Sequence, residues 1–159
     1  VDCDWSSDVC SSDLDGSTEY ENVKNPMTVQ DLMRHTSGLT YGGRPDTSGA
    51  AASLYPSSED VIKMKTTSEF LEKITKVPLV YQPGTVFEYS LSFELLGAVI
   101  EKVTNTSLDT YLRQTIWNPL KMNDTGFHVP ENKKSRQAYA FKLNPLNNRP
   151  QTKIGRAHV

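Results

Sequence analysis

The segment from residue 92 to residue 103, "SFELLGAVIEKV", most constrains the fold, because its apolar side chains cover most of the circumference of a helix. A helix that is apolar on most sides needs packing partners on most sides. We therefore expect this helix to be largely buried and the rest of the chain to build a core around it. Its apolar residues are Phe93, Leu95, Leu96, Ala98, Val99, Ile100 and Val103.

Capping signals predict further helices on both sides of this segment. Good N-cap residues stand before periodic apolar residues, and Gly or Pro follows them. A loop rich in Gly, Ser and Ala is expected from Thr40 to Pro56, and a turn with a short extended stretch at residues 82–90. Beyond Asp124 we expect a short strand or two between loops. The expected helices span residues 29–35 (stopped by Gly38), a turn or two in 57–64, 67–77 (capped by Thr66) and 108–118 (capped by Ser107).

The two ends of the chain are predicted to be non-native. The last seven residues, "KIGRAHV", translate the DNA word AAG ATC GGA AGA GCA CAC GTC. The reverse complement of this word, slightly extended, translates to "CDWSSDVCSSDL", which is the chain from Cys3 to Leu14. One DNA word explains both ends, and it resembles a short-read sequencing adapter. We therefore exclude residues 1–14 and 153–159 and expect one partial domain over residues 15–152.

This exclusion changes what composition can say. The excluded ends carry four aspartates but only one lysine and one arginine, so the net charge of −2 moves to near zero. A near-neutral chain gives no indication of nucleic-acid binding or of a basic membrane patch. Both cysteines lie in the excluded N-terminal segment, so the redox compartment and the localisation stay open. No apolar run approaches the ~20 residues that span a bilayer.

Most motifs for catalysis or cofactor binding are absent from the sequence. It has no G-x-S-x-G elbow, no H-E-x-x-H, no P-loop and no G-x-G-x-x-G after a strand, so we expect neither a metal nor another cofactor. Asp31 and His35 could touch across one helical turn, but a polar helix end with His35 near the last carbonyls is the preferred interpretation. Ser37 is interpreted as a cap of the same helix end.

Tyr89 is the remaining candidate for a catalytic residue. A phenol has a pKa near ~10, so it acts as a base near neutral pH only where cations favour the phenolate. Such chemistry would need a lysine nearby and a serine to deprotonate. From position alone, the other interpretation is preferred, in which the ring packs and water hydrates the hydroxyl.

Four blocks in order resemble the serine beta-lactamase family, more narrowly its class C-like branch with family VIII carboxylesterases and related acyltransferases. The blocks are "HTSGL", "QPG" followed by "YS", "KVTNTS" and "PLKMNDTGF", and the resemblance runs from about Pro26 to Pro130. It implies an α+β chain, an incomplete and mostly helical part of the beta-lactamase/transpeptidase-like fold. It also implies acyl transfer by the serine of a Ser-x-x-Lys motif, with Tyr89 as the general base of a Tyr-x-Asn motif.

The chain departs from the family pattern in two ways. Leu91 stands where beta-lactamases proper have the motif asparagine, which favours an ester or related small acyl substrate over a beta-lactam. No lysine has a serine or threonine three residues before it, so the chain holds no Ser-x-x-Lys. We therefore predict a fragment of a serine hydrolase that is inactive by itself. The alternative is a non-catalytic binding or scaffold homologue, for example a peptidoglycan-associated one.

Overall fold

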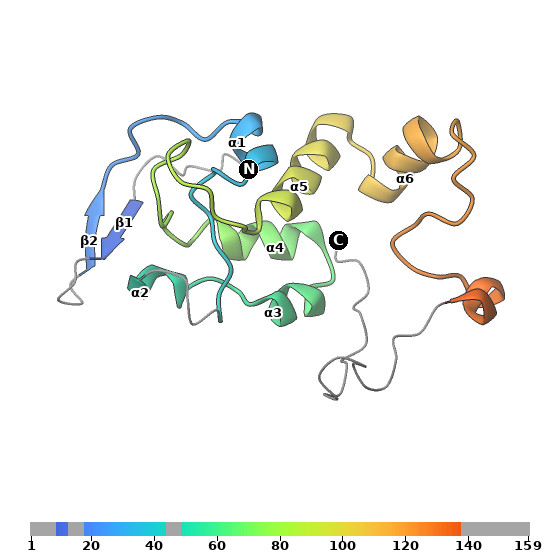
Figure 1. The fold of residues 1–159 in the computed structure, drawn as a ribbon, viewed down its shortest axis with the longest axis horizontal. Helices are drawn as coiled ribbons and strands as arrows, with labels where there is room; N and C mark the ends of the chain where they lie inside the picture. Colours follow the sequence, from blue (N-terminus) through green and yellow to red (C-terminus); the bar gives the residue numbers. More distant parts are fainter. Residues whose placement is uncertain (1–8, 13–17, 44–48, 138–159) are drawn as a thin grey trace, which may run out of the picture. The chain divides into compact units, whose positions relative to one another are not determined.

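The structure is a computed structural model that describes residues 9–12, 18–43 and 49–137 (Figure 1). The chain divides into two compact units, Val1–Asn105 and Thr106–Val159, and each is described by itself. In its described residues the first unit contains a two-stranded antiparallel sheet and five helices, and it carries the candidate site. Its elements are β1 (Val9–Ser12), β2 (Thr18–Glu21), α1 (Val29–Arg34), α2 (Gly49–Ala52), α3 (Ser58–Lys63), α4 (Thr67–Ile74) and α5 (Ser92–Thr104).

The hairpin was not expected from the sequence. Strands β1 and β2 pair antiparallel, with Val9 opposite Glu21 and Ser12 opposite Thr18. Strand β1 lies in the segment that the sequence predicts to be non-native, and the limits of the native domain remain a prediction.

The helix starts follow the capping signals in the sequence. Thr28, Ser57 and Thr66 are the N-caps of α1, α3 and α4, and each side-chain oxygen accepts a backbone N–H from the first turn. In α1 and α3 an aspartate at the third helical position bonds back to the cap, which completes a capping box. These local hydrogen bonds satisfy donors that a helix start otherwise leaves unpaired.

Two sequence expectations for this unit were wrong in detail. Helix α1 ends one turn before Gly38, because His35 itself takes the left-handed conformation with φ of 55°. Gly38 is needed for another reason: its φ is 84°, and a Cβ there would lie 2.1 Å from the carbonyl oxygen of Tyr81. The expected loop from Thr40 to Pro56 contains the short helix α2, whose Ala51 and Ala52 are buried.

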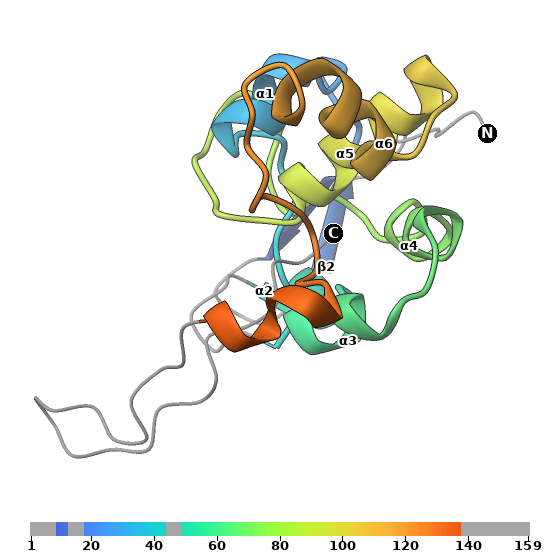
Figure 2. The ribbon, with the colours of Figure 1, turned by 90° about the vertical axis from the view of Figure 1, so that its right-hand side faces the viewer.

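Helix α5 packs against α1 and α4, and both views show α1 beside it (Figures 1 and 2). Its burial is narrower than the sequence predicts, because Phe93 and Val103 are exposed while Leu95 and Ala98 are buried. The core of the unit combines residues of α1, α2, α4 and α5 with those of the connecting segments. Its buried members are Leu32, Leu39, Ala51, Tyr55, Phe70, Ile74, Leu79, Val80, Leu91 and Leu95.

The second unit begins with the expected helix, which is an α-helix in its first part and a π-helix in its second. Ser107 caps α6 (Leu108–Leu112), and the chain continues as a π-helix, η1 (Arg113–Trp117). The Trp117 ring packs edge-on against Phe127 and lies under the Arg113 guanidinium at 5.3 Å. Residues 125–137 contain a 3₁₀-helix, η2 (Glu131–Arg136), in place of an expected strand. Any strand predicted further on lies outside the described residues.

Candidate active site

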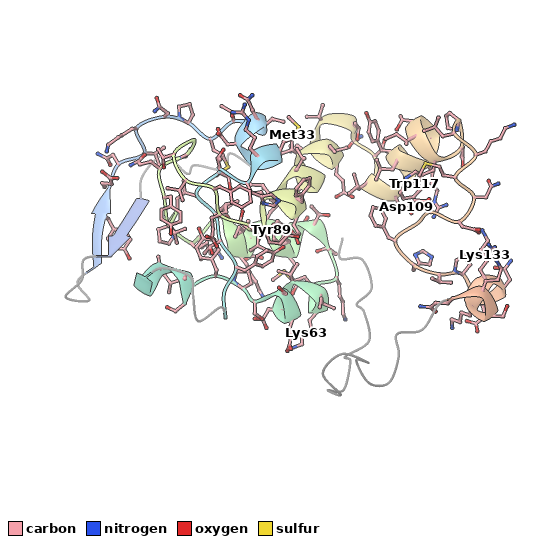
Figure 3. The ribbon with its side chains drawn as sticks, in the orientation of Figure 1. Met33, Lys63, Tyr89, Asp109, Trp117 and Lys133 are labelled. Atoms are coloured by element: carbon pink, nitrogen blue, oxygen red, sulfur yellow. The ribbon has the colours of Figure 1, made fainter. Side chains whose placement is uncertain are left out.

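Tyr89 lies in the extended segment that leads into α5 (Figure 3). Its side chain is 55% exposed, whereas the next two residues of the motif, Ser90 and Leu91, are 1% and 0% exposed. Of the three motif residues, Tyr89 therefore has the accessible side chain. Leu91, which stands at the position of the family's motif asparagine, belongs to the hydrophobic core.

His35 holds the backbone on both sides of Tyr89. The N–H of Glu88 donates to the His35 carbonyl oxygen at 2.8 Å, and the N–H of Ser90 donates to His35 Nδ1 at 3.2 Å. His35 is buried, and its backbone N–H donates to the carbonyl oxygens of Asp31 and Leu32 in α1. The predicted position of His35 at the helix end is confirmed, and its contact with the Tyr89 segment is an addition that the sequence did not reveal.

Three aromatic rings lie near the His35 imidazole, and a fourth stacks on one of these three. Tyr89 is 4.6 Å from it between ring centroids, Phe93 is 4.8 Å away and Phe87 is 6.1 Å away. Tyr41 stacks with Tyr89 at 6.0 Å and an interplanar angle of 27°. Three of these rings, Phe87, Tyr89 and Phe93, are more than half exposed. The site thus combines a buried imidazole with an accessible aromatic surface.

A carboxylate from α5 completes the polar part of the site. The Tyr41 hydroxyl donates to Glu94 Oε1 at 2.9 Å. The other oxygen, Oε2, is buried and has no hydrogen-bond partner in the part of the chain that the structure describes. Burial lowers the pKa of His35, and the charge of Glu94 partly opposes that shift. Because Nδ1 accepts the Ser90 N–H, His35 is the neutral tautomer with its proton on Nε2.

Three buried serines form a hydrogen-bonded row behind Tyr89. Ser92 Oγ lies 2.7 Å from both Ser37 Oγ and Ser90 Oγ. Ser37 Oγ also accepts the N–H of Leu39 at 3.3 Å, so the predicted role of Ser37 as a cap of the preceding helix is wrong. The row joins the "HTSGL" turn to the start of α5 and keeps its hydroxyls out of solvent.

Asp31 does not pair with His35. Its carboxylate accepts the Thr28 backbone N–H at 3.0 Å and the Thr36 hydroxyl at 2.9 Å. The carboxylate also accepts the Thr28 hydroxyl. These three hydrogen bonds, with that from the Thr28 hydroxyl the largest cause, lower the pKa of Asp31. Asp31 therefore stabilises both ends of α1 and takes no part in the Tyr89 site.

A cavity of about 230 Å³ lies in the second unit, lined in part by Arg113, Asp124 and His128. Arg113 pairs with Asp109 at 2.6 Å, and the remaining charged groups pair with one another. Arg136 donates to Asp124 at 2.6 Å and 3.1 Å, and Lys133 lies 2.9 Å from the same carboxylate. These hydrogen bonds lower the pKa of Asp124 to about 2. The cavity therefore has no unpaired charged group of this set to offer a ligand.

The described residues offer no cluster of three or more His, Cys, Asp or Glu side chains that could hold a metal ion. Within the same residues, no helix has the length and apolar character required to cross a bilayer.

Comparison with known proteins places the whole site within one family match. A family model described as "Beta-lactamase" matches residues 17–158. A putative D-alanyl-D-alanine carboxypeptidase of Escherichia coli K12 is 33% identical over 123 residues, which is 76% of this chain and 26% of the relative. An uncharacterized protein of Mycobacterium tuberculosis is 26% identical over 160 residues, which is 98% of this chain and 39% of the relative.

The structural comparison agrees at the level of the fold. The solved structure of EstCE1, a hydrolase with promiscuous acyltransferase activity, superimposes with a TM-score of 0.63 at 24% identity. This match covers 95% of the present chain and 36% of EstCE1. The chain thus spans less than two-fifths of the length of these three similar proteins.

Proposed function

The chain belongs to the beta-lactamase family, and on that premise we propose that Tyr89 is the general base of a serine hydrolase acting on esters or related acyl substrates. Its fold is the α+β fold of beta-lactamases and transpeptidases, in a mostly helical part, as the sequence predicts. One observation carries the proposal: at the motif position that matches the family's tyrosine, Tyr89 is exposed while Ser90 and Leu91 are buried.

The proposed reaction needs groups from outside these 159 residues. A serine hydroxyl attacks the acyl carbonyl, and the tyrosine oxygen takes the serine proton with the help of a lysine. The C–O bond of the ester then breaks, and the departing alcohol receives a proton. Water subsequently attacks the acyl-serine and releases the acid. Because the chain contains no Ser-x-x-Lys, it supplies the base and lacks the nucleophile and its lysine.

The first experiment measures hydrolysis of p-nitrophenyl acetate by the 159-residue chain. We expect no rate above the buffer background. A measurable rate that Tyr89→Phe abolishes would contradict the proposed division of the site.

The second experiment uses the protein encoded at the natural locus, sequenced through both ends without adapters. We expect a Ser-x-x-Lys upstream of Met27, a burst of p-nitrophenol, and a loss of about 10²–10⁴-fold in kcat on Tyr89→Phe. Tyr20→Phe is the matched control, because Tyr20 is 56% exposed and also begins a Tyr-x-Asn sequence. Equal rates for both variants would refute the role of Tyr89, and a locus without the serine or lysine would favour the non-catalytic scaffold.

A further inference from the structure

Tyr89 cannot owe its orientation to burial. More than half of its side chain is exposed, and an exposed side chain ordinarily samples several rotamers. A general base must be held within a few tenths of an ångström of its working position. Whatever fixes Tyr89 therefore has to be found among the groups that contact it.

The structure provides two rings beside Tyr89, and both are anchored. The imidazole of His35 lies 4.6 Å from the phenol ring at an interplanar angle of 34° and is itself buried. The ring of Tyr41 lies 6.0 Å away and is held by its hydroxyl bond to Glu94. Burial holds the imidazole in place, and a hydrogen bond holds the Tyr41 ring. Both rings can therefore restrict the rotamers of the exposed Tyr89 side chain.

His35 also fixes the backbone that carries Tyr89. Its carbonyl oxygen and Nδ1 accept the N–H groups of Glu88 and Ser90, the residues on either side of Tyr89. His35 makes these two hydrogen bonds from a left-handed backbone conformation, with φ of 55°. Such a conformation is unfavourable for a residue other than glycine, and it persists where surrounding contacts impose it.

We propose that His35 is a positioning residue for Tyr89, acting through its ring and through the two hydrogen bonds that bracket the tyrosine. The inference rests on the proposed function only for its catalytic consequence, because the geometry holds without it. The neutral imidazole is the working form, since a proton on Nδ1 would remove the acceptor for Ser90. Around the imidazole, the titratable groups are Tyr89 from the extended segment and Glu94 from α5.

Two variants separate the two actions of His35. His35→Asn keeps a residue that tolerates the left-handed conformation and an oxygen that can accept the Ser90 N–H, but removes the ring. His35→Phe keeps a ring and removes the acceptor. His128→Asn is the matched control, because it makes the same replacement at an exposed histidine of the second unit.

The first measurement is the χ1 rotamer distribution of Tyr89 by NMR scalar couplings in the 159-residue chain. We expect one rotamer in the wild type and in His128→Asn, and averaged couplings in His35→Asn. Unchanged amide shifts in α4 would show that the variant is folded; if His35→Asn unfolds, His35→Phe serves in its place and should also average. Averaged couplings in the wild type, or one rotamer retained in a folded His35 variant, would overturn the inference.

The second measurement is ester hydrolysis by the protein from the natural locus. We expect His35→Asn to lower kcat by up to about 10²-fold with KM unchanged, because His35 orients the base without contacting substrate. If Tyr89→Phe abolishes activity and His35→Asn leaves kcat intact, the positioning role fails and the proposed function stands. If the wild type is inactive but the NMR result holds, the proposed function fails and the positioning role stands.

Discussion

Replacing Leu91 by asparagine would give this chain the Tyr-x-Asn motif of the beta-lactamases proper. Judged by the motif alone, the change should improve recognition of a beta-lactam amide. The structure predicts a different outcome, because Leu91 is fully buried and belongs to the core formed with Leu39, Leu79 and Leu95. We expect Leu91→Asn to destabilise the first unit and to leave substrate choice unchanged.

The size of the effect follows from the burial. Fully burying a leucine side chain is worth about 1.5–3 kcal/mol, which asparagine forfeits. An amide buried there without hydrogen-bond partners costs a further penalty of about 1–3 kcal/mol. The free energy of unfolding should therefore fall by roughly 2.5–6 kcal/mol, a large part of the 5–15 kcal/mol or so that is typical of a domain.

Urea denaturation followed by far-UV circular dichroism measures this difference. Leu54→Asn is the matched control, because Leu54 is 55% exposed and lies outside the core. Its effect should stay within about 0.5 kcal/mol. The reasoning is refuted if both variants unfold at the same urea concentration, since the Leu91 side chain would then be in solvent.

Gly38→Ala should lower the melting temperature far more than Gly43→Ala, because both glycines have a positive φ but a Cβ at Gly38 would meet the Tyr81 carbonyl oxygen at 2.1 Å, whereas at Gly43 the nearest atom is the Ser57 Cβ at 3.4 Å. Burial lowers the pKa of His35, so the unfolded chain binds the proton at higher pH; the urea midpoint should rise with pH through about 6.5, and this rise should shrink in His35→Asn. NMR titration of the Asp124 carboxyl carbon should give a pKa of about 2, with a value near 3.8 contradicting the paired geometry.

The helices could be predicted because their signals are local. N-caps, third-position carboxylates and apolar periodicity all act within a few residues, and they place the starts of α1, α3, α4 and α5 where the structure has them, although α4 ends at Ile74 and not near residue 77. The hairpin β1–β2 and the short α2 carry no such signal. The end of α1 at His35 was predicted, but Gly38 was wrongly taken as the stop because glycine is the usual left-handed residue; here His35 takes that conformation and is held by contacts from far along the chain.

The site was predicted in outline only. Tyr89 could be selected because a family resemblance pointed to it, and its exposure agrees with that choice. The role of Leu91 could not be judged, because a motif does not state which side of the backbone faces the core. The contact between Tyr41 and Glu94 joins residues 53 positions apart, and no periodicity within one segment encodes such a pair.

The serine row also limits how this protein can change during evolution. Ser37 and Ser92 are 55 positions apart in sequence, yet each hydroxyl relies on the other for a buried hydrogen bond. Losing Ser92, which is bonded to both Ser37 and Ser90, removes a buried hydrogen bond from each of them at a cost of about 1–3 kcal/mol, whereas replacing the whole row by apolar residues can be nearly neutral. Positions 37, 90 and 92 should therefore be inherited as a unit, and single substitutions that are harmful alone should become tolerable together. A double-mutant cycle on Ser37→Ala and Ser92→Ala measures this epistasis directly.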